Sequence, residues 1–256
     1  MTTLYANGVK FIDNPEMVLL DKDGTIIDIH HYWASMIRLR SKLIVEEWFK
    51  ERLDSEEIML QLISAMGVDV ESGRMKPEGP VGVKPRSIIV NVAVNSVRQA
   101  GIKVDSVGME ALFAEIDRRT AIDLLPLLRL LPGVKTFLET LMTHRVAAAV
   151  VSTDITSRAT LAMQALGIDH HFHVIVGGDA TSRTKPAADQ AHLALNRGGY
   201  SAYRSVVIGD HPVDIQMGRN AGCALNIGVL TGLSDRSAFS DLDCLVVPDL
   251  THLTVR

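Results

Sequence analysis

The chain has 256 residues, of which 47% are hydrophobic and 22% are charged, and its formal net charge is −4 at pH 7. This length and apolar content are sufficient to bury a full α/β core together with a second, smaller domain. The slightly acidic balance excludes the basic field with which proteins neutralise a nucleic-acid backbone, so we expect no nucleic-acid partner.

Residues 1–8 contain neither a basic segment nor an apolar stretch typical of secretion signals, and no later stretch holds about 18 uninterrupted apolar residues. These features predict a cytoplasmic protein without a membrane span. Cys223 and Cys244 lie far apart and outside a Cys-x-x-Cys pattern. We therefore expect neither a disulfide nor a zinc site, and expect both cysteines to be small core residues. The sequence does not indicate an oligomeric state.

The first predicted element with chemical content is a buried strand in the apolar run at residues 17–20, which stops at Asp21 and Asp23. Side chains alternate along a strand, so both carboxylates should project the same way from its carboxyl end, and Lys22 between them should point away. At average residue frequencies the string Asp-x-Asp-Gly-Thr arises by chance in only a few of about a thousand chains of this length. Two carboxylates so placed indicate a cation site.

Residues 29–127 differ from the rest because their apolar residues recur mostly at helical spacing. Asp54 with Glu57 predicts a capping box at the start of a helix that ends before Gly67. A second helix is predicted over residues 85–100, although the β-branched run inside it is also compatible with a strand. This stretch predicts an inserted helical domain, with residues 1–28 and 128–256 forming the core domain.

After residue 128, strands and helices alternate to the end of the chain. This alternation predicts a doubly wound parallel α/β sheet, in which ligands bind beyond the carboxyl ends of the strands. Asp21, Ser152 and Asp210 should each emerge at that edge. The predicted strands cover residues 146–151, 173–176, 205–208, 224–227 and 245–247, and the predicted helices cover residues 134–144, 156–166, 187–197 and 212–221.

Four motifs in this order resemble those of the haloacid dehalogenase superfamily: the Asp21–Thr25 string, the strand ending at Ser152, the pair Lys185-Pro186, and residues 209–214, which contain Asp210 and Asp214. The resemblance extends over almost the whole chain and is similar to phosphoglycolate-phosphatase-like members, whose cap domain follows the first motif. It implies a Rossmann-like core with a helical cap and a magnesium-dependent phosphohydrolase that forms an aspartyl-phosphate. The Lys-Pro motif departs from relatives in lacking their second proline.

The residues support the same chemistry. Asp21 is the predicted nucleophile, because a carboxylate can divide phosphate-ester hydrolysis into two displacements. Asp23 is the predicted general acid and base, which protonates the leaving alkoxide and then deprotonates the attacking water. A small phosphorylated metabolite is the expected substrate.

A dianionic substrate beside these acids needs fixed positive charge. Asp21, the backbone carbonyl of Asp23, and Asp210 are predicted to hold Mg²⁺, with Asp214 acting through water. Lys185 supplies a second cation, and Ser152 with the amide of Thr153 at a helix entrance should donate hydrogen bonds to the phosphate.

The inserted domain should select the substrate by closing over it. Lys84 and Arg86 are the predicted anion-binding candidates, while packing or solvation explains its other polar and aromatic residues equally well. Those other candidates are His30, His31, Trp33, Arg74, Lys76, Arg118 and Arg119.

Several other functions share this fold. Asp23 argues against a dehalogenase, which needs no second carboxylate, and against a phosphonate hydrolase, which has a small residue there. A phosphomutase like β-phosphoglucomutase uses the same motifs and is the main alternative. A non-catalytic binding protein of this fold is less compatible with the six intact polar motif residues. Neither a P-loop nor a dinucleotide-binding fingerprint is present.

Overall fold

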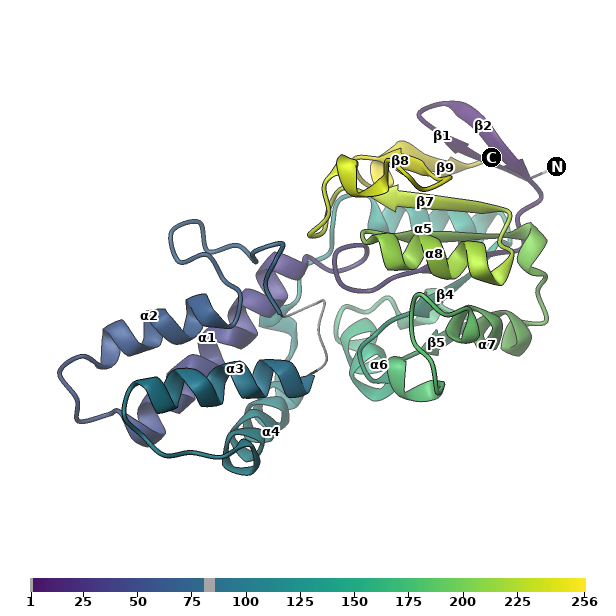
Figure 1. Cartoon of the computed structure of the whole chain (residues 1–256). Coiled ribbons are helices and arrows are strands. Elements are labelled where there is room, and N and C mark those ends of the chain that lie inside the picture. The colour runs from purple at the N-terminus through teal and green to yellow at the C-terminus, as the bar shows by residue number, and fades with distance from the viewer. Residues whose placement is uncertain (1, 81–85) are drawn as a thin grey trace. The chain divides into compact units, whose positions relative to one another are not determined.

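The computed structural model describes residues 2–80 and 86–256 and divides into two compact units (Figure 1). The core unit comprises Met1–Asp28 and Leu128–Arg256, and the helical unit comprises Ile29–Leu127. The chain therefore leaves the core unit after Asp28 and re-enters it at Leu128.

The core unit contains a six-stranded parallel sheet in the order β5-β4-β3-β6-β7-β8. This sheet confirms the predicted doubly wound α/β fold. The chain starts in the middle at β3, builds outward through β4 and β5, and then crosses to β6 on the other side of β3, so the strand order reverses between β3 and β6. The strands are β3 (Met17–Leu20), β4 (Ala147–Val151), β5 (Val174–Val176), β6 (Ser205–Gly209), β7 (Leu225–Val229) and β8 (Leu245–Val247).

Helices cover both faces of this sheet. On one face Met17 and Leu19 of β3 pack in a buried cluster with Leu195 of α7 and Met217 of α8. Figure 1 shows α5 on the opposite side of the sheet from α8. The alternation of β3 side chains between faces accounts for its fully buried apolar sequence. The helices are α5 (Val134–Thr143), α6 (Thr156–Ala165), α7 (Asp189–Gly198) and α8 (Pro212–Ala221), within two residues of their predicted starts.

A three-stranded antiparallel sheet, which the sequence analysis did not predict, joins the two ends of the chain. It has the order β2-β1-β9, with β1 at Thr3–Ala6, β2 at Val9–Asp13 and β9 at Leu253–Val255. Asn7 and Gly8 form the turn between β1 and β2 with φ values of 50° and 78°. Positive φ at both positions matches the twist of a two-residue hairpin, and Asn-Gly is the pair that tolerates it best.

The helical unit consists of α1 (Ile29–Trp48), α2 (Ser55–Ala65), α3 (Arg86–Gln99) and α4 (Ser106–Ile122). The β-branched run within residues 85–100 is helical, and its buried side chains, including Val90, Val94 and Val97, recur at helical spacing. The predicted capping box at Asp54 is wrong, because its carboxylate binds Arg52 at 2.6 and 2.8 Å and makes no cap hydrogen bond. Pro85, the predicted start of the second helix, lies outside the described residues.

The expectation that both cysteines are core residues is also wrong, since Cys223 and Cys244 are each partly exposed. Burial nevertheless raises the pKa of the Cys223 thiol to about 12. Among the helices of the described residues, none combines the length and the apolar character needed to cross a bilayer.

Candidate active site

The candidate site lies at the carboxyl ends of three neighbouring strands. β3 pairs in parallel with both β4 and β6, with Leu20 opposite Val150 and Ile208. Asp21, Ser152 and Asp210 directly follow these strands. Adjacent parallel strands end at the same edge, so the sheet brings these three residues together at the point where strand order reverses, as in other doubly wound sheets that bind ligands there.

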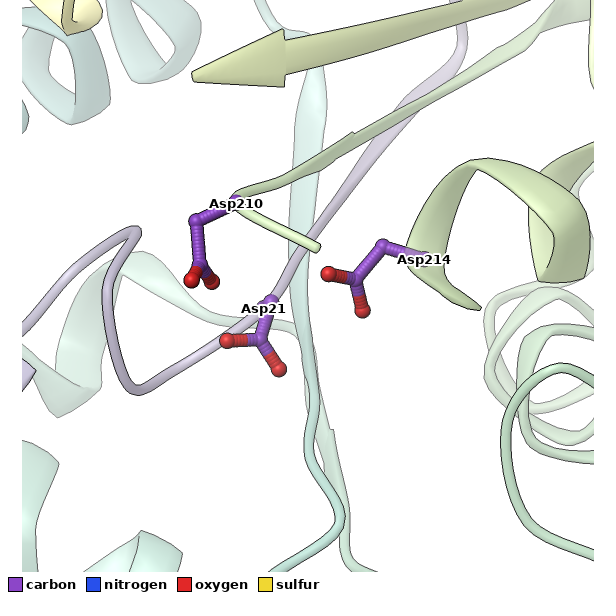
Figure 2. A group of neighbouring side chains, drawn as sticks. All are labelled: Asp21, Asp210 and Asp214. Carbon is purple, nitrogen blue, oxygen red and sulfur yellow. The ribbon is translucent and has the colours of Figure 1, made fainter. Parts of the chain in front are cut away.

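Three carboxylates form the centre of the site. Each of Asp21, Asp210 and Asp214 places an oxygen within 4.8 Å of the others, and Figure 2 shows their carboxylates converging on one region. Asp21 and Asp210 come from the strand ends, whereas Asp214 lies in the first turn of α8. Its Oδ2 also accepts a hydrogen bond from the backbone N–H of His211 at 3.1 Å, which fixes the side chain to the start of the helix.

Burial makes this concentration of negative charge unfavourable without a cation. Desolvation raises the pKa of Asp210 well above its ordinary value, and the charges of Asp21 and Asp214 raise it further. Burial likewise raises the pKa of Asp21, against the opposing effect of the Lys185 ammonium. The three carboxylates supply only oxygen donors, which are the ligands preferred by a hard cation such as Mg²⁺.

Glycines leave room for the Asp210 carboxylate. A methyl group at Gly24, where φ is +94°, or at Gly232 would overlap the carboxylate of Asp210. The backbone N–H of Leu233 donates to Asp210 Oδ2 at 3.4 Å. Two chain segments therefore close around this side chain, and this closely fitted donor set is compatible with a bound metal ion.

Lys185 places a fixed positive charge among these acids. Its Nζ atom lies 2.6 Å from Asp21 Oδ1 and 2.6 Å from Asp214 Oδ1, and only 1% of its side chain is exposed. Burial alone would lower the pKa of Lys185, but the two carboxylates outweigh it and raise the pKa above its ordinary value. The ammonium is therefore charged at neutral pH.

The expectation that Lys22 points away from the acids is wrong. Its Nζ atom lies 2.8 Å from Asp23 Oδ2 and 3.1 Å from Asp154 Oδ2, and its side chain is 1% exposed. β3 ends at Leu20, so strand alternation does not extend to Lys22, and its long side chain reaches the carboxylate beside it. Burial raises the pKa of Asp23, while the Lys22 ammonium opposes this and Asp154 adds to it.

We expect Lys22→Met to destabilise the protein by about 3 kcal/mol, because it leaves the poorly hydrated Asp23 and Asp154 carboxylates without this cation. Urea unfolding followed by circular dichroism would measure the change. The matched control is Lys42→Met, which removes an exposed lysine 3.8 Å from Glu46 and should change stability little. Equal stability of the two variants would show that the Lys22 ion pairs contribute nothing.

The structure places Ser152 and Thr153 differently. Ser152 is buried, and its hydroxyl oxygen accepts a hydrogen bond from the backbone N–H of Asp154 at 3.1 Å, which leaves its O–H available to donate. Thr153 is exposed and precedes α6, whose N-cap is Ile155. The Thr153 amide is therefore not one of the helix's first-turn N–H groups, contrary to the expectation that it lies at the helix entrance.

Two polar residues near the site were not identified from the sequence. Gln190 is fully buried in α7 and hydrogen-bonds to the backbone of both Ser152 and Lys185. It shares a helix face with Ala191 and Ala194, so a polar residue at an apolar position was the available signal. His211 caps α8, where its Nδ1 accepts from the backbone N–H of Val213 at 3.3 Å, and burial lowers its pKa.

Most of the predicted cations of the helical unit are engaged within that unit. Arg86 binds Glu110 at 2.6 Å and also Asp117, which neutralises its charge. Lys84 lies outside the described residues. The remaining candidates contact their own unit as follows: Arg118 and Arg119 bind Glu115, Lys76 binds Ser64, His30 accepts from Met75 N–H, His31 lies 3.2 Å from Pro126 O, and Trp33 packs against Tyr32, whereas Arg74 is exposed.

Comparison with known families gives one match that extends over more than half of the chain. Residues 81–227 match the family model described as haloacid dehalogenase-like hydrolase. The matched range includes Ser152, Lys185, Asp210 and Asp214, four of the polar residues at the strand ends.

Individual relatives agree with this match. The chain is 33% identical over 103 residues to a phosphoglycolate phosphatase of Pasteurella multocida, covering 40% of this chain and 46% of the relative. It is 32% identical over 90 residues to the pyrophosphatase PpaX of Halalkalibacterium halodurans, covering 35% of this chain and 42% of the relative. The chain therefore spans about half the length of the relatives it matches.

Solved structures show the fold over nearly the full length. A predicted phosphoglycolate phosphatase from Haemophilus somnus superposes with a TM-score of 0.68 at 20% identity, covering 93% of this chain and 96% of the other. CbbY from Rhodobacter sphaeroides, solved in complex with phosphate, gives a TM-score of 0.60 at 19% identity, covering 92% and 95%. At this identity the likeness establishes the architecture alone.

Proposed function

Because this chain belongs to the haloacid dehalogenase-like hydrolase family, we propose that it is a phosphatase that cleaves a small phosphate monoester through a phosphorylated Asp21. The relatives named as phosphoglycolate phosphatases and as a pyrophosphatase support a phosphorylated substrate. The proposal concerns the reaction class, and it extends to a small phosphorylated metabolite as the substrate.

The observation that carries the proposal is the bridge that Lys185 forms between Asp21 and Asp214 beside Asp210. A carboxylate nucleophile and a dianionic phosphate repel each other, so a reaction between them needs positive charge fixed at the point of attack. The Lys185 ammonium touches Asp21 and is charged at neutral pH, so it is suited to lie between the nucleophile and the phosphoryl oxygens.

In the proposed mechanism an oxygen of Asp21 attacks phosphorus and the alcohol leaves, which forms an acyl phosphate on Asp21. Asp23 protonates the departing alkoxide and then takes a proton from the water that hydrolyses the acyl phosphate. Lys185 and the free O–H of Ser152 bind the phosphoryl oxygens. Each group is held in place beforehand by the hydrogen bonds described above, so little reorganisation is needed during reaction.

We also propose that Asp21, Asp210 and the backbone carbonyl of Asp23 hold Mg²⁺, with Asp214 acting through water. The support is the buried, oxygen-only donor set and the raised pKa of Asp210, which a nearby cation would relieve. When bound, Mg²⁺ would neutralise negative charge on the phosphoryl group.

The helical unit, residues 29–127, is proposed to act as a cap that selects the substrate and excludes water. Its position in the chain, directly after the segment with Asp21 and Asp23, supports this role. Since Arg86 is bound by Glu110 and Asp117, the proposal no longer relies on it as an anion-binding residue.

Release of inorganic phosphate from a panel of phosphorylated metabolites tests the proposal. We expect hydrolysis of at least one small monoester with added Mg²⁺, complete loss with excess chelator, and recovery when Mg²⁺ is restored. No release from any compound of the panel would overturn the proposed function. Phosphoryl transfer from a sugar bisphosphate that is faster than phosphate release would instead establish the phosphomutase, which uses the same motifs.

A further inference from the structure

The side chain of Gln190 lies entirely inside the core unit. It is the second residue of α7 and has 0% exposure. A buried amide is unfavourable unless its donor and acceptor are both paired, because it has lost its hydrogen bonds to water. Here both ends are paired: Oε1 accepts the backbone N–H of Lys185 at 3.2 Å, and Nε2 donates to the backbone carbonyl of Ser152 at 2.7 Å.

These two bonds join segments that are distant in the sequence. Ser152 follows β4, whereas Lys185 lies in the turn that precedes α7, where the N–H of Ala187 bonds to the carbonyl of Thr184 at 3.0 Å. Gln190 thereby ties the end of a sheet strand to the turn from which the Lys185 ammonium reaches Asp21 and Asp214.

We propose that Gln190 is a positioning residue, whose side chain fixes the separation between Lys185 and Ser152 and so sets the geometry with which both groups bind a phosphoryl group. The inference rests on the proposed function, since Lys185 and Ser152 bind phosphate only in that mechanism. Gln190 itself touches backbone atoms of both residues and none of the three clustered carboxylates. Its effect should therefore fall on phosphate binding and on the transition state, and not on the metal site.

The chain provides a matched control in the same turn. Asn220 of α8 donates from Nδ2 to the carbonyl of Pro186 at 2.9 Å, so it anchors the residue next to Lys185 with the same kind of bond. This bond is exposed, and water can replace it when the side chain is removed. Loss of the Gln190 bonds cannot be compensated in this way, because that side chain is completely buried.

The test is a double-mutant cycle between Gln190→Met and Lys185→Met, measured as kcat/KM for phosphate release. Gln190→Met keeps the approximate volume and removes both hydrogen bonds. We expect it to lower kcat/KM by about 10- to 100-fold, as small misplacements of catalytic groups do, while Asn220→Ala stays within about twofold of the wild type. In the Lys185→Met background the further loss should be less than about threefold, since the two residues act as a unit.

Two further measurements separate positioning from general damage. Calorimetric titration with inorganic phosphate should show weaker binding by Gln190→Met and unchanged binding by Asn220→Ala, and the Mg²⁺ concentration for half-maximal activity should be the same in all three proteins. If Gln190→Met does not fold, Gln190→Asn replaces it, because it retains the amide but is one methylene shorter.

Equal losses from Gln190→Met in the wild-type and Lys185→Met backgrounds would overturn the inference and leave the proposed function intact. Full activity and full phosphate binding by Gln190→Met would overturn it in the same way. Failure of the wild-type protein to release phosphate would instead overturn the proposed function, and the role of Gln190 with it.

Discussion

Asp21→Asn is expected to reduce phosphate release by about 10⁴-fold or more, the scale of loss seen when an enzyme's nucleophile is removed. Asparagine has nearly the same shape but no anionic oxygen, so it can neither attack phosphorus nor form the ion pair with Lys185 at 2.6 Å. Steady-state release with the best substrate of the panel would measure the loss. Rapid acid quenching followed by peptide mass spectrometry should find a phosphoryl group on the wild-type peptide that contains Asp21.

The control for this experiment is Asp241→Asn, which removes an exposed carboxylate of the core unit and should leave release unchanged. Circular dichroism of both variants would show that the fold is retained. Full turnover by Asp21→Asn, or a phosphoryl group trapped on a different residue, would contradict the nucleophilic role of Asp21.

Lys185→Met is expected to lower kcat/KM by about 10²- to 10³-fold, as the removal of one preorganised group that stabilises transition-state charge does. The substitution removes the buried ammonium that bridges Asp21 and Asp214, so the charge of the incoming phosphate is no longer balanced at the nucleophile. The same kinetic assay measures it, and calorimetric titration with inorganic phosphate should show weakened binding.

Lys185→Arg tests whether the shape of the cation matters as well as its charge. A planar guanidinium is larger than an ammonium and does not fit two contacts of 2.6 Å on opposite sides in a site that is almost completely enclosed, so we expect little recovery. A matched exposed variant, Lys42→Met, should have full activity. Wild-type kcat/KM in Lys185→Met would exclude a role for this lysine in the reaction.

The periodicity of the sequence predicted most of the core unit because each signal there is local. α8 was predicted over the same residues that the structure shows, since Pro212 starts the helix and Gly222 ends it in the left-handed conformation. The hairpin of β1 and β2 was missed although Asn7-Gly8 is a strong turn signal, because the flanking strands are short and β2 is largely exposed. Local patterns without a buried face are weak predictors.

The sequence by itself determined the order of buried strands and the positions of the polar residues that follow them, because both depend on short-range patterns of apolar and polar residues. Only the tertiary structure decided which of those residues meet. Lys185 contacts Asp21 across 164 positions of the chain, and Lys22 binds Asp154 across 132. Such contacts depend on strand register and on how helices pack against the sheet, which are set by many distant residues together and by no single motif.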